Sequence, residues 1–414
     1  MRTQYLLNEE KLTLTCLKKI RTIELNETAS YLIKESIIKS RSLDILAREF
    51  GVEKNLVKSD FDNLIKDLNN KGFNLNKNNV QSIQFNQLDL EKYWVPTIPI
   101  VHIIQNCNSP CIICDCWKSK KKYHDAKVLS STFSLLVERG AHSVMVSGGE
   151  PLLHPQLKEV LSAAKDVGLG IELNTNAILL HKFDWLAKFG LDEIIISMDG
   201  IDAESYKFIR GTNKFDKVWE NIHIIKKINP EQSIGIRTTL TNVITRNFIE
   251  YLDFMDKSIV DYVGFSPLDT DSTSFSRDSI SIEVSTDLKN NLLPSSSECK
   301  DLISVLSNKK SDIHKKVTDM HSRGKIDWDT DRFIECLKFY SNNSSKRVKS
   351  SEPCNFPLIS LLIDYDGSLR NCFYSKPFGN IYDKDTINWS MKDPITELKN
   401  NNKCSECRGK IFCE

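Results

Sequence analysis

The stretch CNSPCIICDCW, residues 107–117, decides how the rest of the chain is interpreted. It places Cys107, Cys111 and Cys114 in a C-x3-C-x2-C spacing directly after the apolar run 98–105, which is typical of a buried strand. A loop at the end of a strand therefore presents three thiols to one point. Soft sulfur ligands of this kind suit an iron-sulfur cluster or zinc.

A structural zinc site is closed by a fourth side chain, which Cys116 could supply, so the spacing by itself leaves both metals open. The second decisive stretch is SVMVSGGEPLLHP, residues 143–155, in which an apolar strand leads into four residues in succession: Gly148, Gly149, Glu150 and Pro151. Three cysteines after one strand and GGEP after the next resemble the radical S-adenosylmethionine (SAM) superfamily. The resemblance covers about residues 97–270.

That resemblance implies a 4Fe-4S cluster on Cys107, Cys111 and Cys114, with one iron left open to chelate the amino and carboxylate groups of SAM. It also implies that the GGEP segment hydrogen-bonds the SAM amino group. Glycines at this point let the backbone approach a ligand closely. The expected fold is a partial six-stranded (β/α) barrel, with its chemistry at the carboxyl ends of the strands.

Strands and helices alternate along residues 97–270, as a parallel sheet with outer helices requires. The expected strands are residues 99–105, 143–147, 170–174, 193–197, 233–240 and 262–266.

Further candidate SAM-binding residues follow the later strands. Asn174 begins a segment that matches the family's T-N-G, with Ala177 in the place of glycine. In SMDGIDAESYKFIRG, the resemblance implies that Ser197 contacts the SAM ribose or carboxylate and that Arg210 pairs with the carboxylate, which a planar guanidinium suits. We expect Asp199 to cap the next helix.

The residue before the third cluster cysteine is commonly aromatic in the family, but it is Ile113 here, so adenine packing falls to Trp117. Cys116 is then a neighbour that binds no iron or a thiol on the substrate side, and we favour the first.

Composition narrows the function classes. The chain has 414 residues, a net charge of +1 and 27% charged residues, so it shows neither a nucleic-acid footprint nor general disorder. No signal peptide or membrane-spanning run is present in the sequence. Most of the 12 cysteines gather near 107–116 and 354–413, which favours a reducing cytoplasm with metal-bound thiols. Cys16, Cys299 and Cys336 are expected to be free and buried.

Residues 1–76 predict a separate α+β module with a winged-helix-like order. Short β-type patterns at 4–7, 12–16 and 22–25 precede three helices, the first capped by Asn26. Its net charge of +2 is too small for a convincing DNA-binding face. The pattern resembles the PqqD-like precursor-peptide recognition element, a family that captures a leader peptide as an added strand. Residues 77–96 are expected to be a linker.

Residues 271–350 are polar with helical patterns at 297–306 and 331–340, and we interpret them as a bridge on the substrate side. Residues 351–414 predict a small cysteine-rich domain built on a hairpin with a turn at Asp366 and Gly367. A zinc ribbon is the alternative for such a domain. Behind a radical SAM barrel it resembles the SPASM/twitch domain, which implies at least one auxiliary 4Fe-4S cluster. The candidate ligands are Cys354, Cys372, Cys404 and Cys407, with Cys413 as an alternative ligand or free thiol.

Together these parts look like a maturase of ribosomally made peptides, in which SAM cleavage yields a 5′-deoxyadenosyl radical. The predicted function is oxidative crosslinking of a precursor peptide, a thioether being favoured over a carbon-carbon bond. A flavodoxin- or ferredoxin-type donor would supply electrons, and neither nucleic acid nor membrane is an expected partner. The alternatives are a radical SAM dehydrogenase of a small molecule and, from another class, a non-catalytic metal-binding winged-helix regulator.

Overall fold

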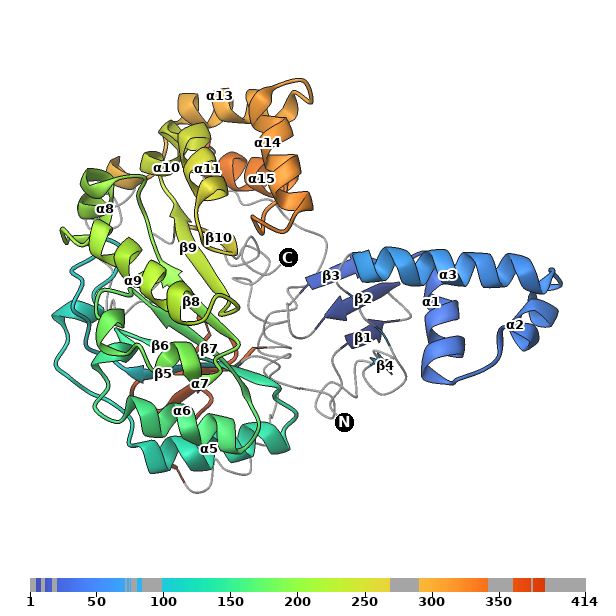
Figure 1. Cartoon of the computed structure of the whole chain (residues 1–414), viewed down its shortest axis with the longest axis horizontal. Coiled ribbons are helices and arrows are strands. Elements are labelled where there is room, and N and C mark those ends of the chain that lie inside the picture. The colour runs from blue at the N-terminus through green and yellow to red at the C-terminus, as the bar shows by residue number, and fades with distance from the viewer. Residues whose placement is uncertain are drawn as a thin grey trace. The chain divides into compact units, whose positions relative to one another are not determined.

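The computed structural model describes residues 5–8, 12–16, 21–70, 73, 75, 80–83, 99–268, 290–341, 360–373 and 375–383. The chain divides into two compact units, an amino-terminal unit ending at Ile98 and a second unit over Pro99–Cys413 (Figure 1).

The amino-terminal unit contains a four-stranded sheet in the order β3-β2-β1-β4. Its strands are β1 (Tyr5–Asn8), β2 (Thr13–Cys16), β3 (Arg21–Glu24) and β4 (Val80–Ile83). The first three are antiparallel and match the expected positions, whereas β4 pairs in parallel with β1. The expected linker 77–96 is therefore wrong at β4, because a short polar segment gains order by completing the edge of a sheet formed far away in the sequence.

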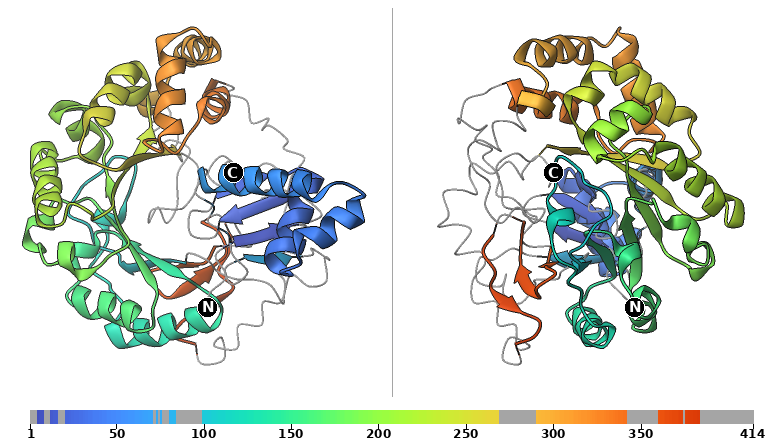
Figure 2. Two further views of the ribbon diagram at one scale, coloured as in Figure 1. Left: turned by 45° about the vertical axis from the view of Figure 1, so that its right-hand side comes forward. Right: turned by 90° about the vertical axis from the view of Figure 1, so that its left-hand side faces the viewer.

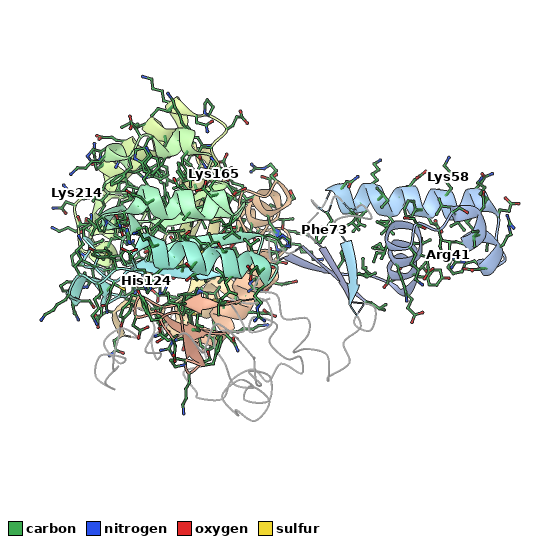
Figure 3. The ribbon with its side chains drawn as sticks, turned by 90° about the horizontal axis from the view of Figure 1, so that it is seen from below. Arg41, Lys58, Phe73, His124, Lys165 and Lys214 are labelled. Carbon is green, nitrogen blue, oxygen red and sulfur yellow. The ribbon has the colours of Figure 1, made fainter. Side chains whose placement is uncertain are left out.

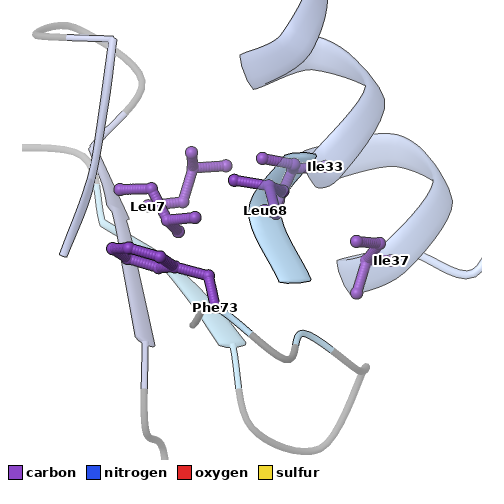
Figure 4. Packing of buried hydrophobic residues seen from close by; sticks show 6 residues of the cluster. Leu7, Ile33, Ile37, Leu68 and Phe73 are labelled. Carbon is purple, nitrogen blue, oxygen red and sulfur yellow. The ribbon is translucent and has the colours of Figure 1, made fainter. Parts of the chain in front are cut away.

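Helices pack on this sheet through a small apolar core. They are α1 (Glu27–Leu32), the π-helix η1 (Ile33–Ile38), α2 (Leu43–Phe50) and α3 (Lys54–Asn70). Asn26 Oδ1 accepts from Ala29 N–H, which confirms the expected cap. Figure 4 shows the core residues Leu7, Ile33, Ile37, Leu68 and Phe73 turned toward one another, and Figure 3 labels Arg41 and Lys58 on the helical side of this unit.

The second unit is a six-stranded parallel sheet that curls into a partial barrel with helices outside (Figure 2). Its strands are β5 (Ile100–Ile104), β6 (Ser143–Gly148), β7 (Gly170–Thr175), β8 (Glu193–Ser197), β9 (Ile234–Leu240) and β10 (Tyr262–Pro267). The intervening helices include α5 (Ala126–Glu138), α6 (Leu157–Asp166), α7 (Leu186–Phe189), α8 (Ala203–Arg210), α9 (Phe215–Ile228), α10 (Asn242–Arg246) and α11 (Phe248–Lys257). The predicted α/β partial (β/α)6 barrel is confirmed.

Both edges of the barrel sheet are extended by later parts of the chain. Beyond β5 lie β11 (Leu362–Ile363), β12 (Ser368–Arg370) and β13 (Gly379–Asn380), with β11 parallel to β5. Beyond β10, Ile326 forms a parallel bridge with Val263. The turn at Gly367, where φ is +85°, confirms the expected hairpin.

The described part of the bridging region, residues 290–341, includes three helices joined by short turns. Its helices are α13 (Ser296–Ser307), α14 (Asp312–Ser322) and α15 (Thr330–Ser341); α13 and α15 agree with the expected helical patterns, whereas α14 was not expected. Cys299 and Cys336 are buried and outside any disulfide, as expected. Across the described residues, no helix combines the length and apolar character needed to cross a membrane.

Alternation along the strands separates an outer and an inner face of the barrel sheet. On β9 and β10, Thr238 and Phe265 both contact Tyr251 of the outer helix α11, through a hydroxyl pair and a ring contact with centroids 5.9 Å apart. Their neighbours Arg237 and Gly264 therefore belong to the inner face.

Candidate active site

The three-cysteine loop is an excursion at the carboxyl end of β5 whose base is closed. Gln105 N–H donates to Lys122 O (2.9 Å), and Ile104 forms an antiparallel bridge with Tyr123. The chain thus leaves and re-enters beside the same strand. This closure fixes the loop at the mouth of the barrel, as the sequence predicted.

Inside the loop, the thiols lie in a poorly hydrated environment. Burial raises the pKa of Cys107 to about 12, with the Glu150 carboxylate adding to the effect. Burial also raises the pKa of Cys111, although the Arg210 charge works in the opposite direction. The thiol of Cys114 has a raised pKa because of its hydrogen bond with Cys116 and its burial. Only a strong positive charge such as iron would hold these groups as thiolates.

The far side of the loop is bound to the end of α8. Ile112 N–H donates to Ile209 O (3.0 Å), and the Ser109 hydroxyl donates to Arg210 O (2.8 Å). Gly211, with φ +70°, lies so close to Pro110 that a Cβ there would collide with its carbonyl oxygen. The SMDG-to-arginine segment therefore acts as a second wall for the cysteine loop.

Gly148 ends β6 and Gly149 follows it, and both face the backbone at the end of β5. A Cβ on Gly148 would collide with Ile104 O, and one on Gly149 would collide with Asn106 O. The backbone groups hydrogen-bond there as well, since Gly149 N–H donates to Ile104 O (2.6 Å). These contacts give the two glycines a structural reason of their own, independent of the approach of a ligand.

Glu150 is fully buried and is used inside the protein. Its Oε1 accepts from the Thr175 hydroxyl (2.6 Å) and from Leu152 N–H (3.0 Å), and its Oε2 accepts from Asn176 N–H (2.8 Å). Burial raises its pKa, and these three hydrogen bonds act against that shift. Pro151 is buried in the single turn that follows. The glutamate therefore connects the ends of β6 and β7.

Two asparagines at the carboxyl end of β7, Asn174 within the strand and Asn176 just after it, lie at the same mouth. Asn174 Nδ2 donates to the Ser147 hydroxyl (3.3 Å), while its buried Oδ1 has no partner among the described residues. Asn176 Nδ2 lies 2.7 Å from Asn108 Oδ1 and 3.7 Å from Cys107 Sγ. Ala177 adopts φ +58°, the left-handed conformation that glycine would favour.

Arg210 is buried and forms an internal ion pair. Its Nη1 lies 3.0 Å from Asp199 Oδ2, and the two side chains are 11% and 3% exposed. Asp199 Oδ1 also accepts from Thr239 N–H (2.6 Å), whereas Asp202 provides the cap of α8. The expectation that Asp199 caps this helix was therefore wrong, because Asp202 stands directly before the first turn. The buried Nε of Arg210 has no partner in the described part of the chain.

Two other candidates lie apart from this hydrogen-bonded group. Ser197 ends β8 and is partly buried beside Arg237 of β9. Trp117 is 39% exposed in the single turn Cys116–Lys118, with the Lys118 ammonium 5.4 Å from its ring centre. Cys116 is buried, and its N–H donates to Cys114 Sγ (3.5 Å).

The donor set of the loop fits an iron-sulfur cluster. Among the residues that the structure describes, no three His, Cys, Asp or Glu side chains converge tightly enough for a single metal ion. A cubane spreads its thiolates over separate irons, so its cysteines need not meet at one point. The unpartnered Arg210 Nε and Asn174 Oδ1 are a donor and an acceptor at the same mouth, as a zwitterionic amino-acid group would require.

Comparison with known families now decides the assignment, since the model of the radical SAM superfamily matches residues 101–256. This part of the chain is a radical SAM domain. The family implies a 4Fe-4S cluster and SAM, which together supply a 5′-deoxyadenosyl radical that removes an unactivated hydrogen atom. Around that pair the radical SAM domain would supply three thiolates, exclude water through the closed loop, and orient SAM through polar groups at the strand ends.

The sequence of the radical SAM domain is similar to part of a curated protein. A probable GTP 3′,8-cyclase of Sulfurisphaera tokodaii is 30% identical over 161 residues, covering 38% of this chain and 49% of that protein. The chain thus spans about half the length of this curated relative.

Two solved structures share the fold. One is SuiB of Streptococcus suis, solved bound to its precursor peptide SuiA. The match includes 99% of this chain and 94% of the SuiB chain, with a TM-score of 0.57 and 16% sequence identity. The protein anSMEcpe, solved with S-adenosylmethionine and a peptide, covers 77% and 88%, with a TM-score of 0.53 and 17% identity.

The expected auxiliary ligands are only partly described. Cys372 lies just after β12, and its N–H donates to the Ser375 hydroxyl (3.2 Å). The remaining candidates lie outside the described residues: Cys354, Cys404, Cys407 and Cys413.

Polar residues that the sequence did not single out bind the C-terminal hairpin to the barrel. His102 Nδ1 lies 3.0 Å from Asp364 Oδ1, and Arg370 Nε lies 3.2 Å from Asp364 Oδ2. The buried His124 contacts the Tyr382 hydroxyl (2.6 Å) and Asp364 O (2.8 Å), and its pKa is lowered by burial. A histidine inside the apolar run 98–105 was the available sequence signal.

Proposed function

We propose that this protein is a radical SAM maturase that oxidatively crosslinks a ribosomally made precursor peptide, most simply through a thioether. Joining a cysteine sulfur to a carbon removes one hydrogen from each. One hydrogen atom leaves in 5′-deoxyadenosine, one proton is released, and one electron passes to an auxiliary cluster. The candidate ligands of that cluster are Cys354, Cys372, Cys404 and Cys407, and Cys413 is an alternative ligand.

The observation that carries this proposal is the extent of the shared fold. SuiB, a protein solved with its precursor peptide bound, aligns with 99% of this chain, a share that includes the residues of the amino-terminal unit. Residues 1–76 are accordingly proposed to be a PqqD-like recognition element for the leader. Residues 351–414 are proposed to be a SPASM/twitch domain, with a flavodoxin- or ferredoxin-type protein as electron donor.

The edge of β3 offers a place for an added strand. No strand pairs with its outer side within the described residues of this unit. Leu25 N–H donates to Leu12 O, so alternation directs the N–H groups of Thr22 and Glu24 away from β2, toward the free edge. An extended leader can therefore gain backbone hydrogen bonds there.

Proline at Thr22 tests this capture. Thr22→Pro removes an outward-facing donor while leaving the pairing with β2 intact, and Thr22→Val is the matched control that keeps the N–H. We expect the proline variant to lose at least tenfold in affinity for a fluorescent leader peptide, with unchanged SAM cleavage in the absence of peptide. Equal affinities of the two variants would contradict capture at this edge.

The substrate class itself has a direct test. Incubation of reduced enzyme and SAM with a cysteine-containing candidate precursor peptide, sought among the short reading frames beside the gene, should give a product lighter by two hydrogens and resistant to thiol alkylation. The competing function is chemistry on a nucleotide or other small molecule, which the probable GTP 3′,8-cyclases favour. Turnover of GTP without any change in the peptide would establish that alternative.

A further inference from the structure

Arg237 lies beside the predicted SAM site on the inner face of the barrel. Ser197, Arg237 and Gly264 are direct neighbours across β8, β9 and β10. Ser197 ends its strand at the mouth, and β9 and β10 each continue one inner-face residue further, to Thr239 and Ser266, so this row lies just inside the mouth. A group held by Arg237 would therefore lie within the barrel, next to the position proposed for SAM.

A glycine makes room for the guanidinium. A Cβ on Gly264 would come within 2.8 Å of Arg237 Nη1 and 3.0 Å of Asp327 Oδ2. Arg237 thus crosses β10 to reach Asp327, whose segment continues the sheet, since Val263 N–H donates to Lys325 O (2.8 Å). The pair spans three adjacent strands of backbone.

This ion pair is held in place but keeps free bonding capacity. Asp327 Oδ1 accepts from Phe265 N–H (2.9 Å), which fixes the carboxylate. Arg237 Nη1 makes only long contacts, 3.3 Å to Phe265 O and 3.4 Å to Asp327 Oδ2. Its Nε and Nη2 have no protein partner in the described residues, and the two side chains remain 38% and 34% exposed.

The charge around the pair restricts what can bind. The inner layer directly below the pair is uncharged at Asn174, Ile195 and Gly235, and the layer below that contains Met145, Glu172 and Glu193, neighbours across β6, β7 and β8. Arg237 is thus outnumbered by Glu172, Glu193 and Asp327 on these rows. Burial raises the pKa of Glu193 and of Asp327, which reduces the negative charge but creates no positive surplus. A triphosphate would find one guanidinium already neutralised by a carboxylate.

We propose that Arg237 and Asp327 anchor the backbone of the peptide segment to be modified, Arg237 donating to a carbonyl and Asp327 accepting from an amide N–H. A neutral pair of donor and acceptor matches an amide group, which carries both functions, better than it matches an anion. The inference rests on the proposed function and gives it a second peptide contact, separate from leader capture in the amino-terminal unit.

The test measures binding of the leaderless half of the substrate peptide to full-length protein in the presence of SAM. We expect Arg237→Gln to weaken this affinity at least tenfold and to raise KM for the complete precursor, while the affinity for the leader alone stays unchanged. Arg246→Gln, which removes an exposed arginine paired with Glu298 on the outside of the same unit, is the matched control and should have no effect.

A second variant guards against misfolding. Gly264→Ala keeps every charge but displaces the guanidinium, so it should reproduce the loss of affinity with unchanged circular dichroism. Unchanged affinity and KM in both variants, while wild-type protein crosslinks the peptide, would overturn this inference alone. If wild-type protein instead binds GTP and leaves the peptide unmodified, the proposed function fails and the anchor fails with it.

Discussion

Two arginine–aspartate pairs of the barrel unit, one at the mouth and one on the inner face, differ in burial and in bonding. Arg210 and Asp199, at the mouth, are 11% and 3% exposed and connect the cysteine loop, α8 and β9. Arg237 and Asp327, on the inner face, are 38% and 34% exposed and make long, incomplete contacts. Motif residues at the mouth thus use most of their hydrogen bonds to hold the surrounding backbone in place. Arg237, which belongs to no motif, keeps donors that we propose bind the substrate.

The largest expected effect concerns the cysteine loop. Cys111→Ala should remove one cluster, about four irons and four sulfides per chain, and abolish deoxyadenosine formation. Cys116→Ala is the matched control and should keep both. The measurement is iron and sulfide content after anaerobic preparation. Zinc in place of iron would contradict the assignment of this site.

Breaking the buried Arg210–Asp199 pair should lower the stability of the protein strongly. Arg210→Met leaves Asp199 as a buried charge without its counter-ion, so we expect a loss of about 3–5 kcal/mol in the free energy of unfolding. Urea unfolding of the metal-free protein measures this loss. The double variant Arg210→Met with Asp199→Asn should recover part of this loss. A loss below about 1 kcal/mol in the single variant would mean that the Arg210–Asp199 pair contributes no more than an exposed ion pair.

Two glycines, Gly149 at the mouth and Gly264 on the inner face, allow the same two regions to be compared. A Cβ on Gly149 meets rigid backbone, whereas a Cβ on Gly264 meets the movable ends of Arg237 and Asp327. Gly149→Ala should cost about 3 kcal/mol of unfolding free energy, and Gly264→Ala less than about 1 kcal/mol. Thermal and urea unfolding of the two variants compare them directly. Equal losses would remove the distinction between the mouth and the inner face.

The smallest expected change in stability belongs to the open pair. Arg237→Met should alter the free energy of unfolding by at most about 1 kcal/mol, because a partly exposed ion pair contributes little. Its effect should be seen instead in the affinity for the leaderless peptide. A stability loss as large as that of Arg210→Met would make Arg237 a structural residue.

Local patterns predicted a large share of this fold. Apolar runs separated by helical patterns located all six barrel strands, and the Asp366–Gly367 turn located the C-terminal hairpin. The hairpin's place was not predictable, because β11 pairs with β5 across about 260 residues of chain. The strand β4 was missed for the same reason, since its partner β1 lies at the other end of the unit.

The sequence alone determined which chemistry the chain can host, since cysteine spacing and the GGEP turn are local features whose geometry follows from a few adjacent residues. Tertiary structure decided how those residues are used. It placed Glu150 and Asp199 in internal bonds, and it brought Arg237 of β9 to Asp327, 90 residues later. The physical reason is strand register. Only the pairing of parallel strands fixes which distant side chains share a face, and therefore which of them keep hydrogen-bonding groups without a partner inside the protein.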